Sequence, residues 1–366
     1  VEYLDWGGQE EILSNRYFHP FLLRKPIRRI GISSSHSIEW QNFNHYWTVN
    51  HPYDIWKQAA SKKKARSLGV HVNTQRLAWA LKARALLNEN CKLLSATVKK
   101  VNVENNNIIS VETESGSVVT GDYWIDATGF KKILASNLKI EEQDFSDRIK
   151  VDTAITVNVQ SEEENNAAWT QALAMPAGWA WKIATKGNIS YGYVYSSKYT
   201  SDRKARKLLK EISNTKIKPH KIKWKPKIVT KPYQPNCTLV GLSCGFLEPL
   251  EAMSSQMMMK NIKITVKLLK QKAKSHQAFE EIQQKANERW LPWVNKAAAY
   301  IAFHYAVSKR EGKFWQDYRD FANEYEEMLE IAQLAAFRKH EDALFKGAPF
   351  SVASWQVVLA GAEAVR

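Results

Sequence analysis

Residues 237–255, CTLVGLSCGFLEPLEAMSS, are the stretch that most clearly indicates a fold and a site. An apolar strand over 238–242 leads through a glycine turn into Glu-Pro-Leu-Glu, after which small polar residues open a helix. A helix N-terminus offers unpaired amide donors and a partial positive charge, so it suits an anion. Pro249 fixes the backbone between Glu248 and Glu251. The two glutamates can be read as helix caps, but paired carboxylates beside apolar residues are more often functional.

A second string, DYWIDATGF at residues 122–130, ends a predicted strand in an acidic residue, small residues and a glycine. Backbone of this kind can approach a ligand closely at the carboxyl edge of a sheet. The string is short, so an ordinary strand-to-turn junction explains it equally well.

The remaining patterns predict a mixed α/β body followed by a helical C-terminal part. Apolar residues at helical spacing predict an amphipathic helix over 71–87, and a turn at residues 105–107 joins predicted strands over 92–103 and 108–114. Further strands are predicted over 155–159 and 192–196, and the pattern is helical from Ser255 almost to Arg338. We therefore expect an α/β body over residues 1–254 and a helical part over 255–366.

Composition is that of a globular protein: 366 residues, 44% of them apolar. No apolar run has the length of a membrane span, and the sequence does not open with a secretory leader. The three cysteines, Cys91, Cys237 and Cys244, are too few and too far apart for a disulfide framework or a metal site. We therefore expect a reducing, cytoplasmic compartment, no membrane partner and no bound metal.

The formal net charge of +16 raises the question of a nucleic-acid partner. Many lysines lie between Lys216 and Lys231, where they alternate with Ile222, Trp224 and Ile228. Alternation with a period of two predicts a half-buried edge strand with a solvated lysine face, and we favour this over a phosphate-binding stripe. We do not expect nucleic acid to be the partner.

The Glu248-Pro-Leu-Glu251 segment after Gly-Phe-Leu resembles the signature of flavin-dependent tryptophan halogenases. Other strings resemble motifs of the same family in the same order, so the resemblance covers nearly the whole chain: 3–6, 17–21, 122–130, 178–183, 193–197, 303–315 and 350–361. It implies an α/β fold like that of FAD-dependent monooxygenases. Residues 1–254 would be a partial, Rossmann-type FAD domain that lacks its first βαβ unit, together with a substrate-side sheet. Residues 255–366 would be a helical, substrate-binding part.

The resemblance also implies an activity: reduced FAD, O2 and chloride or bromide yield hypohalous acid, which halogenates tryptophan or a related indole. A separate flavin reductase would supply FADH2, and members of the family are often homodimers. Glu251 matches the glutamate that assists the substitution, and the backbone amides of Met253 and Ser254 match the halide site. The matching substrate-binding residues are His19, Phe21, Tyr305, Glu311 and Trp315, and the matching cofactor-binding residues are Val98, Asp126, Gly129, Leu242 and Ser255.

Several positions depart from the family pattern. The chain holds no Gly-x-Gly-x-x-Gly turn, and the catalytic lysine of the family would precede Val1. We therefore expect a truncated member that is inactive as it stands. Ala184 occupies a position where the family usually has proline, which leaves a related flavin hydroxylase as an alternative. A degenerate, noncatalytic basic protein is the other alternative that the sequence leaves open.

Overall fold

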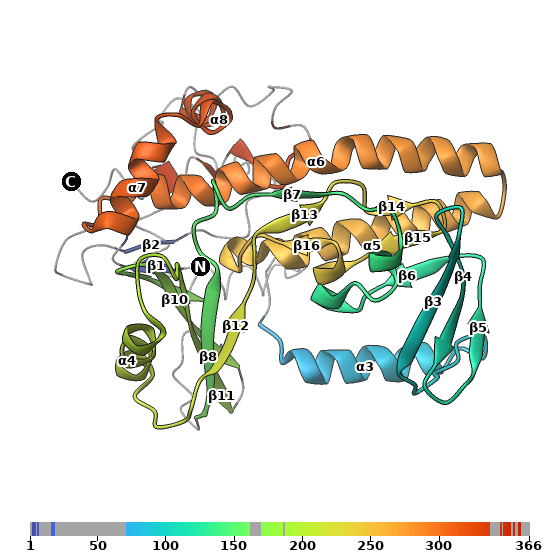
Figure 1. Ribbon diagram of the computed structural model, residues 1–366. Helices are drawn as coiled ribbons and strands as arrows, with labels where there is room; N and C mark the ends of the chain where they lie inside the picture. The colour runs from blue at the N-terminus through green and yellow to red at the C-terminus, as the bar shows by residue number, and fades with distance from the viewer. Residues whose placement is uncertain are drawn as a thin grey trace, which may run out of the picture. The chain divides into compact units, whose positions relative to one another are not determined.

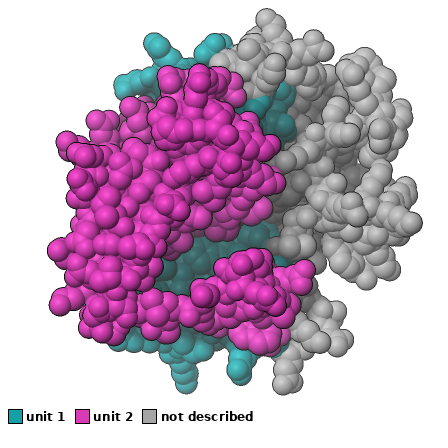
Figure 2. Space-filling model, turned by 90° about the vertical axis from the view of Figure 1, so that its right-hand side faces the viewer, with its two compact units in different colours: residues 1–74, 150–223, 299–366 teal, residues 75–149, 224–298 magenta. Residues whose placement is uncertain are grey.

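The computed structural model describes residues 2–4, 6, 16–18, 71–161, 170–185, 187–336, 345, 347–352, 354–355 and 358–359. The chain divides into two compact units (Figure 2). Unit 1 comprises residues 1–74, 150–223 and 299–366, and unit 2 comprises residues 75–149 and 224–298. The division predicted between residues 254 and 255 stays a prediction.

Unit 1 is built on a seven-stranded sheet (Figure 1). All neighbouring strands are antiparallel except β1 and β9, which are parallel. The strand order across the sheet is β12 (His220–Lys223), β8 (Thr153–Gln160), β11 (Asn188–Tyr195), β10 (Gly178–Thr185), β9 (Gln171–Met175), β1 (Glu2–Leu4) and β2 (Arg16–Phe18).

The core of this sheet forms because alternate residues of its strands point to the same face. Ile155 and Val157 of β8 and Tyr193 and Tyr195 of β11 pack together on that face. Helix α4 (Asp202–Ser213) covers it and adds the buried side chains of Ala205 and Leu209. Ser201 caps this helix by accepting a hydrogen bond from the amide of Lys204, and Asn214 ends it in a left-handed conformation.

The helical pattern predicted from residue 255 onward is confirmed. Four helices, α5 (Met253–Lys272), α6 (His276–Ala306), α7 (Lys313–Ala322) and α8 (Glu326–Ala336), occupy most of residues 253–336. No helix in the described part of the chain is long and apolar enough to span a membrane.

Unit 2 contains three small sheets. The first is the hairpin of β3 (Val98–Glu104) and β4 (Asn107–Thr113) with β5 (Val118–Thr120). Asn105 and Asn106 both have positive φ in its turn, as asparagine tolerates, and the predicted turn is confirmed. The second sheet has the strand order β14 (Tyr233–Gln234), β15 (Cys237–Leu239) and β6 (Trp124–Asp126). The third has the strand order β16 (Gly245–Phe246), β13 (Lys227–Val229) and β7 (Glu142–Asp144).

The predicted helix over 71–87 is present as α3 (Thr74–Leu86), but none of its 13 residues is buried. Trp79 is 73% exposed and Leu81 61% exposed. The sequence pattern correctly identified the helix, whereas the apolar side that it predicts is not buried.

The lysine-rich stretch is two strands rather than one. Lys223 ends β12, which is exposed along its whole length at the edge of the large sheet, as an edge strand was predicted to be. Trp224 is buried, and β13 then begins at Lys227 in a different sheet. Pro226 lies between the two strands and has no N–H to continue a ladder. The prediction of a half-buried strand is therefore wrong for β12.

Candidate functional site

Asp126 is a fully buried carboxylate at the carboxyl end of β6. Its Oδ1 accepts hydrogen bonds from the Thr128 amide (2.9 Å), the Thr128 hydroxyl (2.7 Å) and the Ser243 hydroxyl (2.9 Å). Its Oδ2 accepts from the amides of Leu134 (3.0 Å) and Ala135 (2.9 Å). Burial by itself would raise the pKa of Asp126, but these donors outweigh burial and hold the pKa below its usual range. The side chain therefore fixes two loops in place.

The two loops held by Asp126 contain glycines that leave open space. Strands β6 and β15 are parallel, so the loops that follow them meet at one sheet edge. Gly129 (φ 72°) and Gly241 (φ 67°) both have left-handed backbone, and a Cβ at either would meet no atom within 4 Å. The Gly129 amide donates to Ser243 Oγ at 3.0 Å, which ties one loop to the other. A ligand can therefore approach the backbone at both loops.

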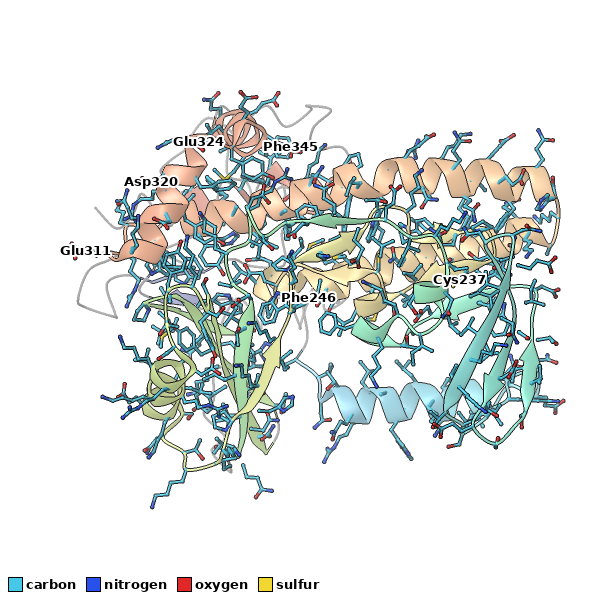
Figure 3. All side chains as sticks on the ribbon, viewed as in Figure 1. Cys237, Phe246, Glu311, Asp320, Glu324 and Phe345 are labelled. Carbon is cyan, nitrogen blue, oxygen red and sulfur yellow. The ribbon has the colours of Figure 1, made fainter. Side chains whose placement is uncertain are left out.

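Aromatic rings continue this region of unit 2. The ring of Phe246 lies edge-on to Phe130 and Trp224, with centroids 6.0 and 5.3 Å apart. The indole N–H of Trp224 donates to the backbone oxygen of Leu247 at 2.8 Å, which anchors the segment before Glu248 (Figure 3 labels Phe246). The Glu-Pro-Leu-Glu segment thus follows a strand end that is fixed by buried contacts.

Glu251 lies in a tight turn immediately before α5. Its side chain is 4% exposed, and Glu248 is fully buried. Glu251 (φ 59°) and Ala252 (φ 51°) both have left-handed backbone, which is costly for residues with a side chain. Helix α5 begins at Met253, has no acidic residue in its first turn, and receives no side-chain cap from Ala252. This helix start can bind an anion through its backbone amides.

The other predicted cofactor residues of unit 2 differ in exposure. Leu242 is exposed and lies in the loop directly after Gly241. Ser255 is exposed in the first turn of α5. Val98 begins β3 and packs against a small core that includes Val111 and Ile108. Leu242 therefore lies beside the glycine loops, and Val98 is partly buried against this small core.

In unit 1, the predicted substrate-binding residues Tyr305 and Trp315 belong to a buried aromatic cluster. Both are fully buried, and their ring centroids are 5.7 Å apart. Trp6 lies 5.6 Å from Tyr305 and 5.3 Å from Trp315. The indole N–H of Trp315 donates to the backbone oxygen of Met175 on β9 at 3.0 Å, and Tyr305 stacks on Tyr318 at 4.4 Å. No individual role for Trp6 or Tyr318 is predicted from the sequence.

Glu311 lies in the exposed loop between α6 and α7 and points away from the helices around it (Figure 3). The loop itself is fixed in place. Arg319 donates to the backbone oxygens of Ser308 (2.8 Å) and Arg310 (2.9 Å), and Ser308 Oγ donates to the backbone oxygen of Trp6 at 2.6 Å. The structure thus groups Tyr305 with Trp315 but leaves Glu311 apart from them. His19 and Phe21 lie outside the described residues.

The Trp-x-Trp string lies on β10. Trp179 and Trp181 have ring centroids 5.9 Å apart, and Trp181 covers Gly192 on the neighbouring strand β11. Ala184, where the family usually has proline, pairs with Ile189 in the ladder. Its carbonyl oxygen lies 3.2 Å from Nδ1 of His71. At this position the chain is regular antiparallel sheet.

The three cysteines are free thiols, and Cys237 and Cys244 are buried while Cys91 is exposed. Within the described ranges, no three acidic, histidine or cysteine side chains form a group that could hold a metal ion.

Comparison with known proteins gives a consistent set of relatives. A family model described as tryptophan halogenase matches residues 1–366. Tryptophan 7-halogenase RebH of Lentzea aerocolonigenes is 34% identical over 155 residues, which are 40% of this chain and 29% of that protein. Tryptophan 7-halogenase KtzQ of Kutzneria sp. (strain 744) is 26% identical over 238 residues, 62% of this chain and 44% of that protein. The chain thus matches less than half the length of these two relatives.

Solved structures share the fold. A tryptophan halogenase from Shewanella frigidimarina NCIMB 400 has a TM-score of 0.79 at 23% identity, covering 99% of this chain and 72% of that chain. BrvH, a flavin-dependent halogenase from Brevundimonas sp. BAL3, has a TM-score of 0.77 at 22% identity, covering 99% and 76%. At these identities the likeness establishes the fold alone, and it confirms the predicted α/β class with its helical C-terminal part.

Proposed function

The chain belongs to the tryptophan halogenase family. We propose that it is part of a flavin-dependent halogenase, an enzyme that chlorinates or brominates tryptophan or a related indole. The observation that supports this most directly is the buried Glu251 in a left-handed turn at the uncapped start of α5. We favour halogenation over the two alternatives from the sequence, a hydroxylase and a noncatalytic basic protein, because the family model matches residues 1–366.

The glycine loops fit a flavin cofactor. Gly129 and Gly241 leave open space at the carboxyl ends of two parallel strands, where nucleotide cofactors bind in α/β folds. We propose that Gly129, Leu242, Val98 and Ser255 contact FAD. Asp126 acts as a positioning residue, because all five of its hydrogen bonds come from the protein itself. When bound, reduced FAD would reduce O2 to the peroxide level, and the resulting oxidant would convert halide to hypohalous acid.

In this proposal Glu251 is the general base that accepts the proton lost from the ring during the substitution. The attacked ring carbon forms a bond to the halogen, and the oxygen–halogen bond of hypohalous acid breaks. The ring carbon then loses its proton to the Glu251 carboxylate. Glu251 passes this proton to the hydroxide released from hypohalous acid, which leaves as water. A buried carboxylate stabilises the cationic ring and accepts its proton more effectively than an exposed one.

The halide and the substrate are assigned to separate residues. The backbone amides of Met253 and Ser254 would hold chloride or bromide, since the start of α5 receives no side-chain cap from Ala252. In unit 1, Tyr305 and Trp315 would form the aromatic wall beside the indole. The assignment of His19, Phe21 and Glu311 to the substrate stays a prediction. The flavin reductase that supplies FADH2, the cytoplasmic location and a homodimeric state are part of the same proposal.

The test of catalysis pairs two substitutions in one motif. The protein that contains this chain is incubated with a flavin reductase, FAD, O2, bromide and a panel of indoles. We expect brominated product by mass spectrometry, and a loss of about 10²–10⁴-fold in rate for Glu251→Gln. Glu248→Gln is the control, because Glu248 lies in the same motif and is also buried. This variant should keep most of the activity. Equal losses in both variants would contradict the role of Glu251, and no halogenated indole at all would reject the proposed reaction.

The cofactor assignment has its own test, which needs no turnover. Gly129→Val fills the open space at the loop and should weaken FAD binding by at least tenfold, measured by quenching of flavin fluorescence. Gly187→Val is the matched control, because Gly187 (φ 77°) also has left-handed backbone and open space but lies in the β10–β11 turn. If the two variants bind FAD alike, the glycine loop is not the cofactor site.

A further inference from the structure

Helix α4, the loop over 214–219 and strand β12 form one strongly basic surface of unit 1, which we call the basic surface. Residues 201–223 contain nine Lys or Arg but only two Asp or Glu. Ala205 and Leu209 bury the apolar side of α4 against the sheet, so its other side faces solvent. The exposed cations are Arg203, Lys204, Lys207, Lys210, Lys216, Lys218, Lys221 and Lys223.

The parts of this surface are joined to one another. Lys221 of β12 forms an ion pair with Asp202 at the start of α4, and Lys207 pairs with Glu211 at 4.0 Å. Arg206 donates to the backbone oxygen of Pro219 at 3.4 Å. Both acidic residues are therefore already paired, and the other exposed cations have no carboxylate partner among the described residues. The surface lacks the negative charge that would balance it.

Strand β12 adds an open sheet edge to this charge. It is the last strand of the seven-stranded sheet and pairs only with β8 among the described strands. All four of its residues are exposed, and Ile217 (53%) and Ile222 (39%) are exposed apolar side chains within the basic surface. An antiparallel edge strand presents alternate N–H and C=O groups outward, where another strand can pair with it.

We propose that the basic surface binds an acidic, extended segment of another polypeptide, which adds a strand to the edge of β12. Backbone hydrogen bonds to β12 supply strand pairing, as in other cases of β-strand addition. Carboxylates on alternate residues of such a segment lie on one face, about 7 Å apart, where lysines of β12 and the loop can pair with them. Apolar residues on its other face match Ile217 and Ile222. This interaction lies outside the proposed halogenation.

Two other anionic partners fit the surface less well. Proteins that bind single-stranded nucleic acid stack bases on aromatic rings, and residues 201–223 contain no Phe, Tyr or Trp. Helices that insert into membrane surfaces need a free apolar side, and α4 uses its apolar side on the sheet. Lysines on an edge strand can also serve only to prevent pairing, and the experiment must separate that role from binding.

The test is fluorescence anisotropy with a labelled peptide of alternating glutamate and valine. We expect saturable binding that weakens as salt rises, because charge pairs contribute. A peptide of the same charge with prolines in place of two valines cannot complete the ladder and should bind at least tenfold more weakly. Oligothymidylate and phosphatidylserine vesicles should bind more weakly than the glutamate–valine peptide.

Matched variants locate the site. The triple variant Lys210→Gln, Lys218→Gln, Lys223→Gln should lose at least tenfold in affinity. The control triple variant Lys263→Gln, Lys267→Gln, Lys270→Gln removes the same charge from exposed positions on α5 and should bind like the parent chain. Three results would each overturn the proposal. The first is equal binding of the proline and valine peptides, and the second is an equal effect of the two triple variants. The third is binding of oligothymidylate or vesicles by a protein that does not bind the glutamate–valine peptide. None of these readouts depends on halogenation.

Discussion

Replacing Asp126 with asparagine tests how the loops of the proposed cofactor site are held. The substitution keeps the shape of the side chain but turns one oxygen into an NH2 group. At the Oδ2 position, that group would face the amides of Leu134 and Ala135. At the Oδ1 position it would face the Thr128 amide and two hydroxyls, those of Thr128 and Ser243. Hydroxyls can rotate and accept, so the second placement costs less.

The expected loss of stability follows from the number of Asp126 hydrogen bonds that asparagine cannot accept. One main-chain N–H loses its acceptor inside the protein, which costs about 1–3 kcal/mol. The remaining bonds change from charge-assisted to neutral, which makes each of them weaker. We therefore expect Asp126→Asn to lower the free energy of unfolding by about 2–5 kcal/mol. Asp122→Asn is the control, since Asp122 is exposed four residues earlier, and it should change the free energy by less than about 0.5 kcal/mol.

The assay is urea unfolding followed by tryptophan fluorescence and circular dichroism at several pH values. The pKa of Asp126 is lower in the folded protein than in the unfolded chain, where it is about 3.9. Its ionised form therefore stabilises the fold above that pH, and the contribution is lost as pH falls through the folded-state pKa. Asparagine does not titrate, so the gap between parent and variant should be constant above about pH 5 and shrink below about pH 4.

Two results would refute this reasoning. If Asp126→Asn and Asp122→Asn lose equal stability, the five hydrogen bonds do not hold the loops. If the gap between parent and Asp126→Asn does not change with pH, the pKa of Asp126 is the same in the folded and unfolded states, and the hydrogen bonds do not favour its ionised form.

Two further predictions concern packing and thiol reactivity. Gly192→Ala places a Cβ about 2.1 Å from the ring of Trp181 and should lower the free energy of unfolding in urea by about 1–3 kcal/mol. Gly121→Ala is the control and should be close to neutral, because the nearest atom to its Cβ would be 3.7 Å away. Equal effects of the two substitutions would contradict the close packing of β10 and β11. Burial raises the pKa of Cys237 and of Cys244 to about 12. Ellman's reagent should therefore titrate one thiol, the exposed Cys91, in the folded protein and all three thiols in urea. Rapid reaction of a second thiol in the folded protein would contradict the burial of Cys237 and Cys244.

Local sequence signals identified the elements that depend on local chemistry. The asparagines at 105 and 106 tolerate positive φ, so the turn of the β3–β4 hairpin was predictable. The helical spacing over 71–87 correctly gave α3. The same spacing did not show which side would be covered, because burial depends on neighbours that the pattern does not contain. The lysine alternation failed for a related reason: period two continues past Pro226 in the sequence, whereas the hydrogen-bond ladder does not.

The candidate site was predictable only in part. The strings around Gly129 and Glu251 carried a chemical signal in the sequence, and both lie at positions where the structure provides a loop or a helix start. Ser243 supports Gly129 from 114 residues away, and Trp6 packs beside Trp315 from the other end of the chain. Such partners are chosen by the fold, and a single sequence contains no local signal for them.

The turn at Glu251 shows how far local propensity can be overridden. Left-handed backbone suits glycine or asparagine, yet Glu251 and Ala252 both adopt it, at about 1–2 kcal/mol each. The flanking side chains of Leu250 and Met253 are buried, so the turn cannot relax without uncovering them. Glycines would remove the strain, but they would leave the backbone free to reorient and would supply no carboxylate. Strain that persists beside a buried acid and an uncapped helix start is characteristic of a site whose geometry matters more than its stability.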